Sequence, residues 1–204
     1  ESLYIYGEAL EFALKRDWNL RLLSVGLGLG YNELIAASLS LKYKKPLELI
    51  DSFEIEPMLT TQFLSWLGLA PENLDKEFQK AYETILCFCE KHFNVSAPMI
   101  LEQIVELYQN QQWKIFENFN LQSSNKNDYT VLFFDPFRQK TNPELWKEND
   151  LLQALQSMTS NFCVFSTYAA KGALTRALRA CHFHIDLREG FMGKRNSTFA
   201  WKTP

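Results

Sequence analysis

The chain has 204 residues, of which 47% are apolar, and its formal net charge is −3 at pH 7. This length and apolar content predict a single globular domain over residues 1–204, and the weak negative charge argues against a non-specific nucleic-acid binder. No apolar run is long enough to cross a bilayer. The four cysteines form no C-x-x-C pair, which favours a reduced, cytoplasmic protein.

Strand and helix patterns alternate along the chain. Short apolar runs predict strands over residues 21–25, 47–53, 113–119, 130–134, 161–167, 183–187 and 198–201. Helical spacing of apolar residues predicts helices over residues 4–15, 34–43, 58–67, 71–92, 98–112, 143–158 and 171–181. This order predicts an α/β fold with a doubly wound, mostly parallel sheet and an antiparallel C-terminal hairpin. The three extra helices between the second and third strands could form a lid or a substrate-facing subdomain.

Charge is unevenly distributed along these elements. Residues 138–204 contain ten Lys or Arg and five Asp or Glu, whereas residues 1–137 contain eleven basic and nineteen acidic residues. Such an asymmetry can place a basic rim on one face of the folded chain. Ordinary surface charge is the alternative explanation.

A glycine-rich loop joins the first predicted strand to the helix that follows it. Gly26, Gly28 and Gly30 form the pattern G-x-G-x-G. A dinucleotide fingerprint would need glycine at position 31, where Tyr31 stands. The shorter pattern suits a ligand that has an adenosine and an amino-acid carboxylate but no pyrophosphate, which describes S-adenosylmethionine. A tight turn without any ligand is the alternative.

Polar side chains follow other strands at the edge where an open α/β sheet binds its ligand. Glu54 follows the second strand, about 20 residues past the glycine loop, where a carboxylate can accept both ribose hydroxyls. Asp135 follows four apolar residues and is a candidate for catalysis, although a strand-end acid can also be a cap or a loop anchor. Tyr168 follows the fifth strand and could orient a substrate. Cys87, Cys89 and His92 lack a fourth ligand, so we expect no metal site.

One long motif resembles a known family. Residues 135–146, D-P-F-R-Q-K-T-N-P-E-L-W, resemble the D-G-F-x-P-x-x-N-P-E-L/M-W stretch of the methyltransferase domain of tRNA 5-methylaminomethyl-2-thiouridine biosynthesis proteins, the MnmC family. Four further segments resemble motifs of this family in the same order: residues 26–32, 52–57, 167–178 and 190–195. The resemblance covers nearly the whole chain from about Leu22 onward.

The resemblance implies a Rossmann-like class I methyltransferase that uses S-adenosylmethionine. Its methyl acceptor would be the 5-aminomethyl group of the wobble 2-thiouridine in tRNA. Nothing follows Pro204, so we expect a stand-alone methyltransferase without the flavin-dependent oxidase domain of the bifunctional members.

The resemblance also implies roles for particular residues. Asp135 and Tyr168 would be catalytic, and Asp135 would also contact the cofactor. The other cofactor contacts would be Gly26, Leu27, Gly28, Gly30, Asn32, Glu54 and Glu117. Substrate contacts, including phosphates of the anticodon arm, would come from Phe137, Arg138, Lys194 and Arg195.

Some positions depart from the family pattern. Ser24 stands where the family often has glutamate, and Glu117 and Asn118 stand where it has Gly-Asp beside the adenine. Arg138 lies in a loop that also differs. Three alternatives therefore stay open: a methyltransferase for a small-molecule or protein amine, a nicotinamide oxidoreductase, which Tyr31 argues against, and a non-catalytic module on the same fold.

Overall fold

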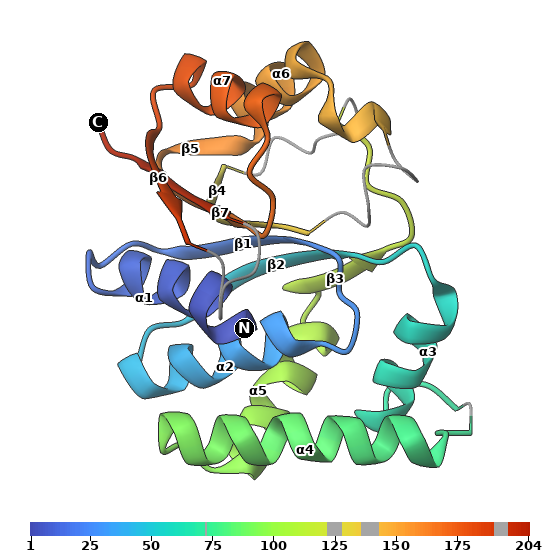
Figure 1. Ribbon diagram of the computed structural model, residues 1–204. Helices are drawn as coiled ribbons and strands as arrows, with labels where there is room; N and C mark the ends of the chain where they lie inside the picture. The colour runs from blue at the N-terminus through green and yellow to red at the C-terminus, as the bar shows by residue number, and fades with distance from the viewer. Residues whose placement is uncertain (72, 122–127, 136–142, 190–195) are drawn as a thin grey trace.

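The computed structural model describes residues 1–71, 73–121, 128–135, 143–189 and 196–204. Its strands form one seven-stranded sheet in the order β3-β2-β1-β4-β5-β7-β6 (Figure 1). The strands are β1 (Leu20–Val25), β2 (Leu47–Phe53), β3 (Trp113–Phe116), β4 (Tyr129–Phe134), β5 (Thr159–Thr167), β6 (His184–Arg188) and β7 (Ser197–Lys202). Strands β1 to β5 pair in parallel, and β7 runs antiparallel to both β5 and β6. The predicted fold class is confirmed.

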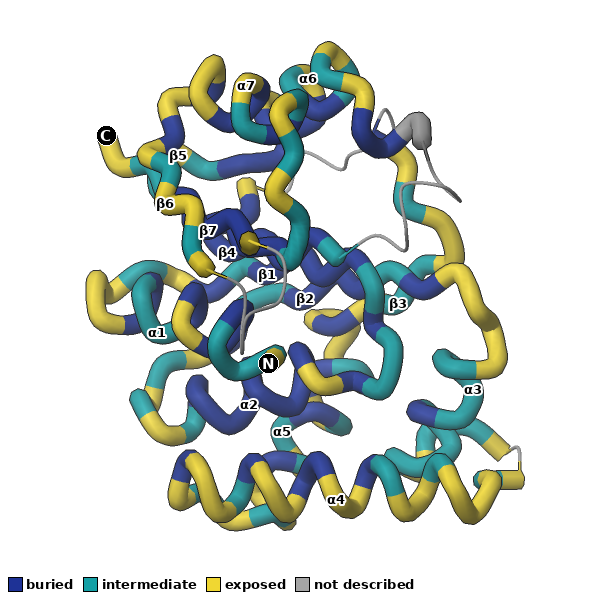
Figure 2. The backbone as a smooth tube through the Cα atoms, in the orientation of Figure 1, coloured by how far each residue is buried: buried dark blue, intermediate teal, exposed yellow. Residues whose placement is uncertain are grey.

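The central strands are buried on both faces of the sheet. Successive side chains of a strand point to opposite faces. Leu22 of β1 therefore belongs to one hydrophobic cluster and Leu23 to the other, as do Phe133 and Phe134 of β4. Figure 2 shows these strands as the buried centre of the molecule. Such two-sided burial explains why β4 has no polar residue among its last four positions.

Helices cover both faces of the sheet. One face carries α1, α2, α4 and α5, and the other carries α6 and α7 (Figure 1). The helical segments are η1 (Leu3–Gly7, a π-helix), α1 (Glu8–Leu14), α2 (Tyr31–Tyr43), α3 (Pro57–Trp66), α4 (Lys76–Phe93), α5 (Ala97–Gln109), η2 (Pro143–Trp146, a 3-10 helix), α6 (Glu148–Met158) and α7 (Gly172–Ala180).

Several predicted boundaries were wrong for local reasons. Helix α4 begins at Lys76 and not at residue 71, because the Asp75 side chain caps it by accepting a 2.7 Å hydrogen bond from the Glu77 N–H. The helix predicted over residues 143–158 is divided at Lys147, whose backbone is extended. The third strand ends at Phe116 rather than at residue 119.

The extra helices between β2 and β3 have a packing role. Helix α4 lies across α2 and α5 and contacts α3. Its Tyr82, Ile85 and Cys89 are buried in the same hydrophobic cluster as α2. In Figure 1 this helix forms an outer layer on the side of α2 that faces away from the sheet. Helix α4 thus thickens one face of the domain instead of forming the lid that we had considered.

Candidate active site

Three loops begin at the same level of the sheet. In the strand register, Val25 of β1 is opposite both Phe53 of β2 and Phe134 of β4. The residues that follow these strands are the first glycine of the loop, Glu54 and Asp135. Strand β1 has β2 on one side and β4 on the other, so this point is the topological switch of the sheet, where doubly wound folds bind their ligands.

Glu54 holds the glycine loop in place. Its side chain is 2% exposed. One carboxylate oxygen accepts a 2.8 Å hydrogen bond from the Gly28 N–H, and the other accepts one of 2.9 Å from the Glu56 N–H. A carboxylate can accept about four hydrogen bonds. Glu54 therefore supports the loop and keeps acceptor capacity for the hydroxyls of a ribose.

A side chain would meet different surroundings at each of the three glycines of the loop. At Gly26, with φ of 95°, an added Cβ would lie 2.7 Å from the backbone oxygen of Asp135. At Gly30 it would lie 2.3 Å from the Phe63 ring of α3. At Gly28, with φ of 55°, it would meet nothing within 4 Å. Two glycines allow close packing beneath and beside the loop, while the third borders open space.

This loop suits a nucleoside that carries an amino-acid carboxylate. The first turn of α2 follows Gly30, and the first N–H groups of a helix have no partner within the helix. Together with the positive end of the helix dipole, they can bind a carboxylate. Open space over Gly28 and the acceptor capacity of Glu54 complete a cradle that S-adenosylmethionine would fit.

Asp135 lies beside this cradle. Its N–H donates a 2.9 Å hydrogen bond to the carbonyl oxygen of Val25, which ties the end of β4 to β1. Burial raises the pKa of its carboxyl to about 6, against the opposing effect of the Tyr6 hydroxyl, and the negative charge of Glu1 adds a small further increase. An aspartate with such a pKa is still ionised at pH 7 but is a stronger base than an exposed one.

Two tyrosines form an aromatic wall near Asp135. The ring of Tyr6 lies 4.8 Å from that of Phe133 and meets the ring of Tyr168 edge-on at 5.3 Å, centroid to centroid. Tyr6 is held there because the Ser166 hydroxyl donates a 2.6 Å hydrogen bond to the carbonyl oxygen of Ile5. Burial raises the pKa of Tyr168 to about 12, so this hydroxyl stays protonated at neutral pH.

Tyr6 is a site residue that was not predicted from the sequence. Its position in the N-terminal helical pattern indicated only a buried helix face. The residue comes to the site because η1 packs against β5, far away in the sequence. No local pattern signals such a contact.

Glu33 is a second residue that sequence reasoning missed. It is fully buried in the first turn of α2, where its carboxylate accepts a 2.7 Å hydrogen bond from the Ser52 hydroxyl. Burial raises its pKa to about 7, although the hydrogen bond from Ser52 opposes the shift. An acid in the first turn of a helix normally indicates an exposed residue that interacts with the dipole. Its burial follows from the tertiary packing under the glycine loop.

The remaining predicted site residues have different outcomes. Leu27 and Asn32 are buried in the loop and the start of α2. Glu117 is exposed directly after β3, at the strand end where the Glu54 N–H donates a 2.9 Å hydrogen bond to the Phe116 carbonyl oxygen. Four predicted substrate contacts lie outside the described residues: Phe137, Arg138, Lys194 and Arg195.

Two kinds of feature are absent from the part of the chain that the structure describes. No group of three His, Cys, Asp or Glu side chains there could hold a metal ion. None of the helices in the described ranges combines the length and the apolar character that crossing a membrane requires.

Comparisons with known proteins agree with this geometry. Residues 104–203, just under half of the chain, match a protein-family model described as S-adenosyl-L-methionine-dependent methyltransferase. A segment of 63 residues is 33% identical to the tRNA 5-methylaminomethyl-2-thiouridine biosynthesis bifunctional protein MnmC of Pseudoalteromonas atlantica. That segment is 31% of this chain but 9% of the relative's length.

Solved structures show the same fold. The structure of MNMC2 from Aquifex aeolicus superposes with a TM-score of 0.61 at 21% identity and covers 100% of this chain and 61% of that protein. A SAM-dependent O-methyltransferase from Thermotoga maritima superposes with a TM-score of 0.51 at 12% identity, over 98% of this chain and 66% of that one. The recognised resemblance to the MnmC methyltransferase region is confirmed, as is S-adenosyl-L-methionine as the cofactor of the matched family.

Proposed function

Because this chain is related in sequence and in fold to S-adenosyl-L-methionine-dependent methyltransferases, we propose that it methylates an amine in tRNA. The acceptor is the 5-aminomethyl group of 2-thiouridine at the wobble position. One observation supports the proposal most directly: Glu54 contacts the glycine loop, and the same loop contacts the backbone of Asp135. A tRNA substrate would place the protein in the cytoplasm.

The residues at the ends of β1 and β2 would bind the cofactor and orient its methyl group. Glu54 accepts the ribose hydroxyls, and the first turn of α2 binds the amino-acid carboxylate. When bound, S-adenosylmethionine supplies a methyl group on a positively charged sulfur. The loop residues would hold this group in a fixed orientation toward the attacking amine, and such orientation can lower the barrier by several kcal/mol.

Asp135 acts on the attacking amine. The nitrogen must be unprotonated to attack, yet a carboxylate beside an ammonium group favours the charged form. Asp135 therefore works by accepting an N–H hydrogen bond from the neutral amine, which directs the lone pair at the methyl carbon. Once methylated, the amine nitrogen would carry a positive charge and would have to release a proton. Asp135, whose pKa burial raises to about 6, receives or relays that proton.

The aromatic residues border the base of the acceptor nucleotide. Bases of single-stranded loops in RNA are bound largely by stacking on aromatic side chains. Tyr168 is half-buried and its hydroxyl lies 3.4 Å from the Ser2 hydroxyl, so its ring has a fixed position. Tyr6 lies behind it and excludes water from Asp135.

A transfer assay tests this function. The protein is incubated with methyl-labelled S-adenosylmethionine and, in separate reactions, tRNA that carries 5-aminomethyl-2-thiouridine, the same tRNA with the modification complete, a metabolite extract and a protein extract. We expect label in the first reaction alone, in the wobble nucleoside after digestion. Label only in metabolites or proteins would reassign the acceptor. Absence of label together with no thermal shift by the cofactor would indicate a non-catalytic module.

A further inference from the structure

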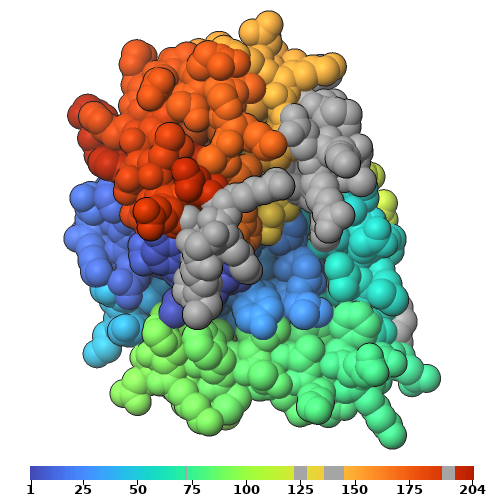
Figure 3. Space-filling model, viewed as in Figure 1, coloured from blue at the N-terminus to red at the C-terminus, as the bar shows by residue number. Residues whose placement is uncertain are grey.

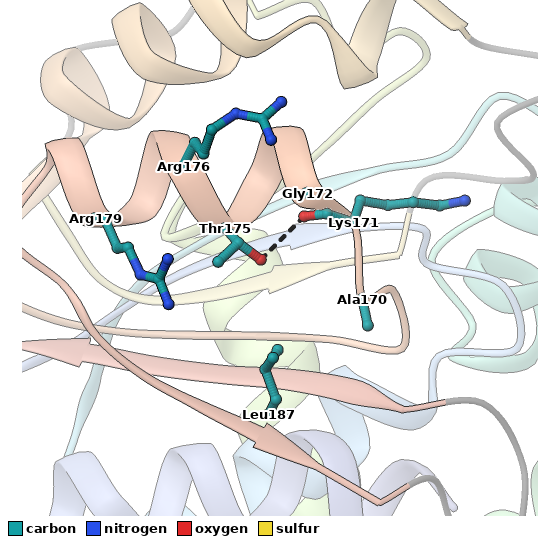
Figure 4. A pocket seen from close by; sticks show the side chains of 7 residues that line it. All are labelled: Ala170, Lys171, Gly172, Thr175, Arg176, Arg179 and Leu187. Carbon is teal, nitrogen blue, oxygen red and sulfur yellow. Dashed lines mark hydrogen bonds between the residues drawn. The ribbon is translucent and has the colours of Figure 1, made fainter.

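A positively charged pocket lies between the start of α7 and β6 (Figure 4). Its volume is about 290 Å³. Lys171, Arg176 and Arg179 line it together with the exposed Leu187 of β6, and no acidic residue of the described ranges does. In Figure 4 Arg179 points from α7 toward the β-strands, Arg176 lies on the other side of the helix in this view, and Lys171 extends from the start of the helix. We call this cavity the α7 pocket.

The positive charge of the α7 pocket is only partly compensated by the protein. Helix α7 has no acidic residue in its first turn, and its N-cap, Lys171, makes no capping hydrogen bond. Cations at a helix N-terminus are unfavourable because the dipole is positive there. Arg176 forms an ion pair with Glu148 of α6, at 2.7 Å, whereas among the described residues Lys171 and Arg179 form none. Asp186 of β6 is paired with Arg188.

Gly172 contributes to the same arrangement. A Cβ at this position would lie 3.1 Å from Nη1 of Arg176. The lack of a side chain therefore leaves room for the guanidinium group over the first turn of the helix. Packing a cation against the positive end of a helix is unfavourable in the free protein, and an anion bound beside them would reduce that cost.

The α7 pocket is joined to the candidate active site by a short, anchored loop. Lys171 follows Tyr168 by three residues. The loop between them is held to β7 because the Thr198 hydroxyl donates a 2.6 Å hydrogen bond to the Ala169 carbonyl oxygen. A nucleotide whose base lies against Tyr168 would thus have its neighbouring backbone close to the pocket.

We propose that the α7 pocket binds a backbone phosphate of the RNA substrate next to the nucleotide that is methylated, an inference that rests on the proposed function. Its volume is just below the range for small-molecule sites and suits a phosphate with part of its ribose. The guanidinium group of Arg and the ammonium group of Lys commonly contact the phosphates of nucleic acids. The apolar Leu187 can lie against the sugar.

The test is tRNA binding measured at several salt concentrations. In the double variant Lys171→Ala, Arg179→Ala we expect the dissociation constant to rise about tenfold or more near 0.1 M salt. The slope of log affinity against log salt should become shallower by about 0.7 to 0.9, because one phosphate contact is lost. The matched control is Lys80→Ala on α4, which lies at the opposite side of the molecule from α7 (Figure 3). Arg179→Lys should keep most of the affinity because it keeps the charge.

Further measurements separate this proposal from the proposed function. The double variant should bind S-adenosylmethionine as the wild type does and should methylate the free 5-aminomethyl-2-thiouridine nucleoside at an unchanged rate. If wild-type protein binds tRNA through these residues but does not methylate it, the phosphate site stands and the methylation proposal fails. Wild-type tRNA affinity and salt slope in a folded double variant would overturn the phosphate site. The phosphate site would also be overturned if the double substitution weakened the binding of inorganic phosphate but not the binding of tRNA. The pocket would then bind a free anion.

Discussion

The two halves of the candidate site are built differently. At the ends of β1 and β2, backbone geometry dominates: glycines approach their neighbours closely, and Glu54 holds the loop through the N–H of Gly28. At the ends of β4 and β5, side chains dominate: Asp135, Tyr6 and Tyr168 come from three separate parts of the chain. The first half suits tight binding of one cofactor, and the second suits chemistry on an acceptor.

This difference leads to distinct expectations for substitution. Changes in the first half should alter cofactor affinity or stability, whereas changes in the second should alter turnover or its pH dependence. Variants that mix the two effects would show that the halves are not separate.

The largest expected effect is that of Asp135→Asn. An amide cannot accept the proton that the amine releases, so turnover should fall about 100-fold or more, while cofactor affinity stays within about twofold. Single-turnover methylation and calorimetric titration of S-adenosylmethionine measure the two quantities. Unchanged turnover would remove Asp135 from the mechanism.

Glu54→Ala should have the next largest effect, on binding. The variant loses the proposed ribose acceptor and the support of Gly28, so the dissociation constant of S-adenosylmethionine should rise about 10- to 100-fold. Calorimetry again measures it, with Glu56→Ala at the exposed neighbouring position as the control. Native affinity in Glu54→Ala would refute the assignment.

Glu33→Gln tests the buried acid beneath the glycine loop. The folded-state pKa of Glu33 is about 7 against an ordinary value of 4.5, so between these values the folded protein holds a proton that the unfolded chain releases. The free energy of unfolding must therefore fall as pH rises through this window, by about 1 kcal/mol between pH 6 and pH 8. Gln cannot ionise, and the variant should lose this part of the pH dependence.

Denaturant unfolding at pH 6 and pH 8 checks the Glu33 prediction. Asp135, with a pKa of about 6, should leave a smaller residual dependence in the variant. Identical pH dependence in the two proteins would mean that Glu33 is ionised in the folded state across this range.

Tyr6→Phe should have the smallest effect. The Tyr6 hydroxyl lowers the pKa of Asp135, so its removal should raise that pKa above about 6. The acid limb of the profile of kcat/KM against pH should move to higher pH, by a fraction of a unit. Tyr4→Phe, which removes a hydroxyl from the same segment, is the control. An unshifted limb would indicate that the hydroxyl does not interact with Asp135 in solution.

Much of the fold was predictable because the signals are local. The strand predicted over residues 47–53 has the same bounds as β2, and the glycine loop separates β1 from α2 as expected. Boundaries failed where a cap or an extended residue intervened, as at Asp75 and Lys147. Asp75 is a residue type that commonly caps a helix and could have indicated the start of α4, whereas Lys147 carries no such signal.

The candidate site was predictable in part. Glu54 and Asp135 could be named because carboxyl ends of parallel strands meet at one edge, which is a rule of topology rather than of sequence distance. Tyr6 and Glu33 could not, since one depends on the packing of η1 against β5 and the other on the burial of a charged residue. Both are long-range consequences of the folded core.

The close approach of Gly26 to the backbone of Asp135 couples the positions of the two halves of the site. No side chain could be inserted at this junction, and neither loop can be displaced without the other. If the backbone at Asp135 were shifted to admit a bulkier acceptor, the glycine loop proposed to bind the cofactor would shift as well. Altered selectivity is more readily obtained from the tyrosine rings, which can be exchanged while the junction stays intact.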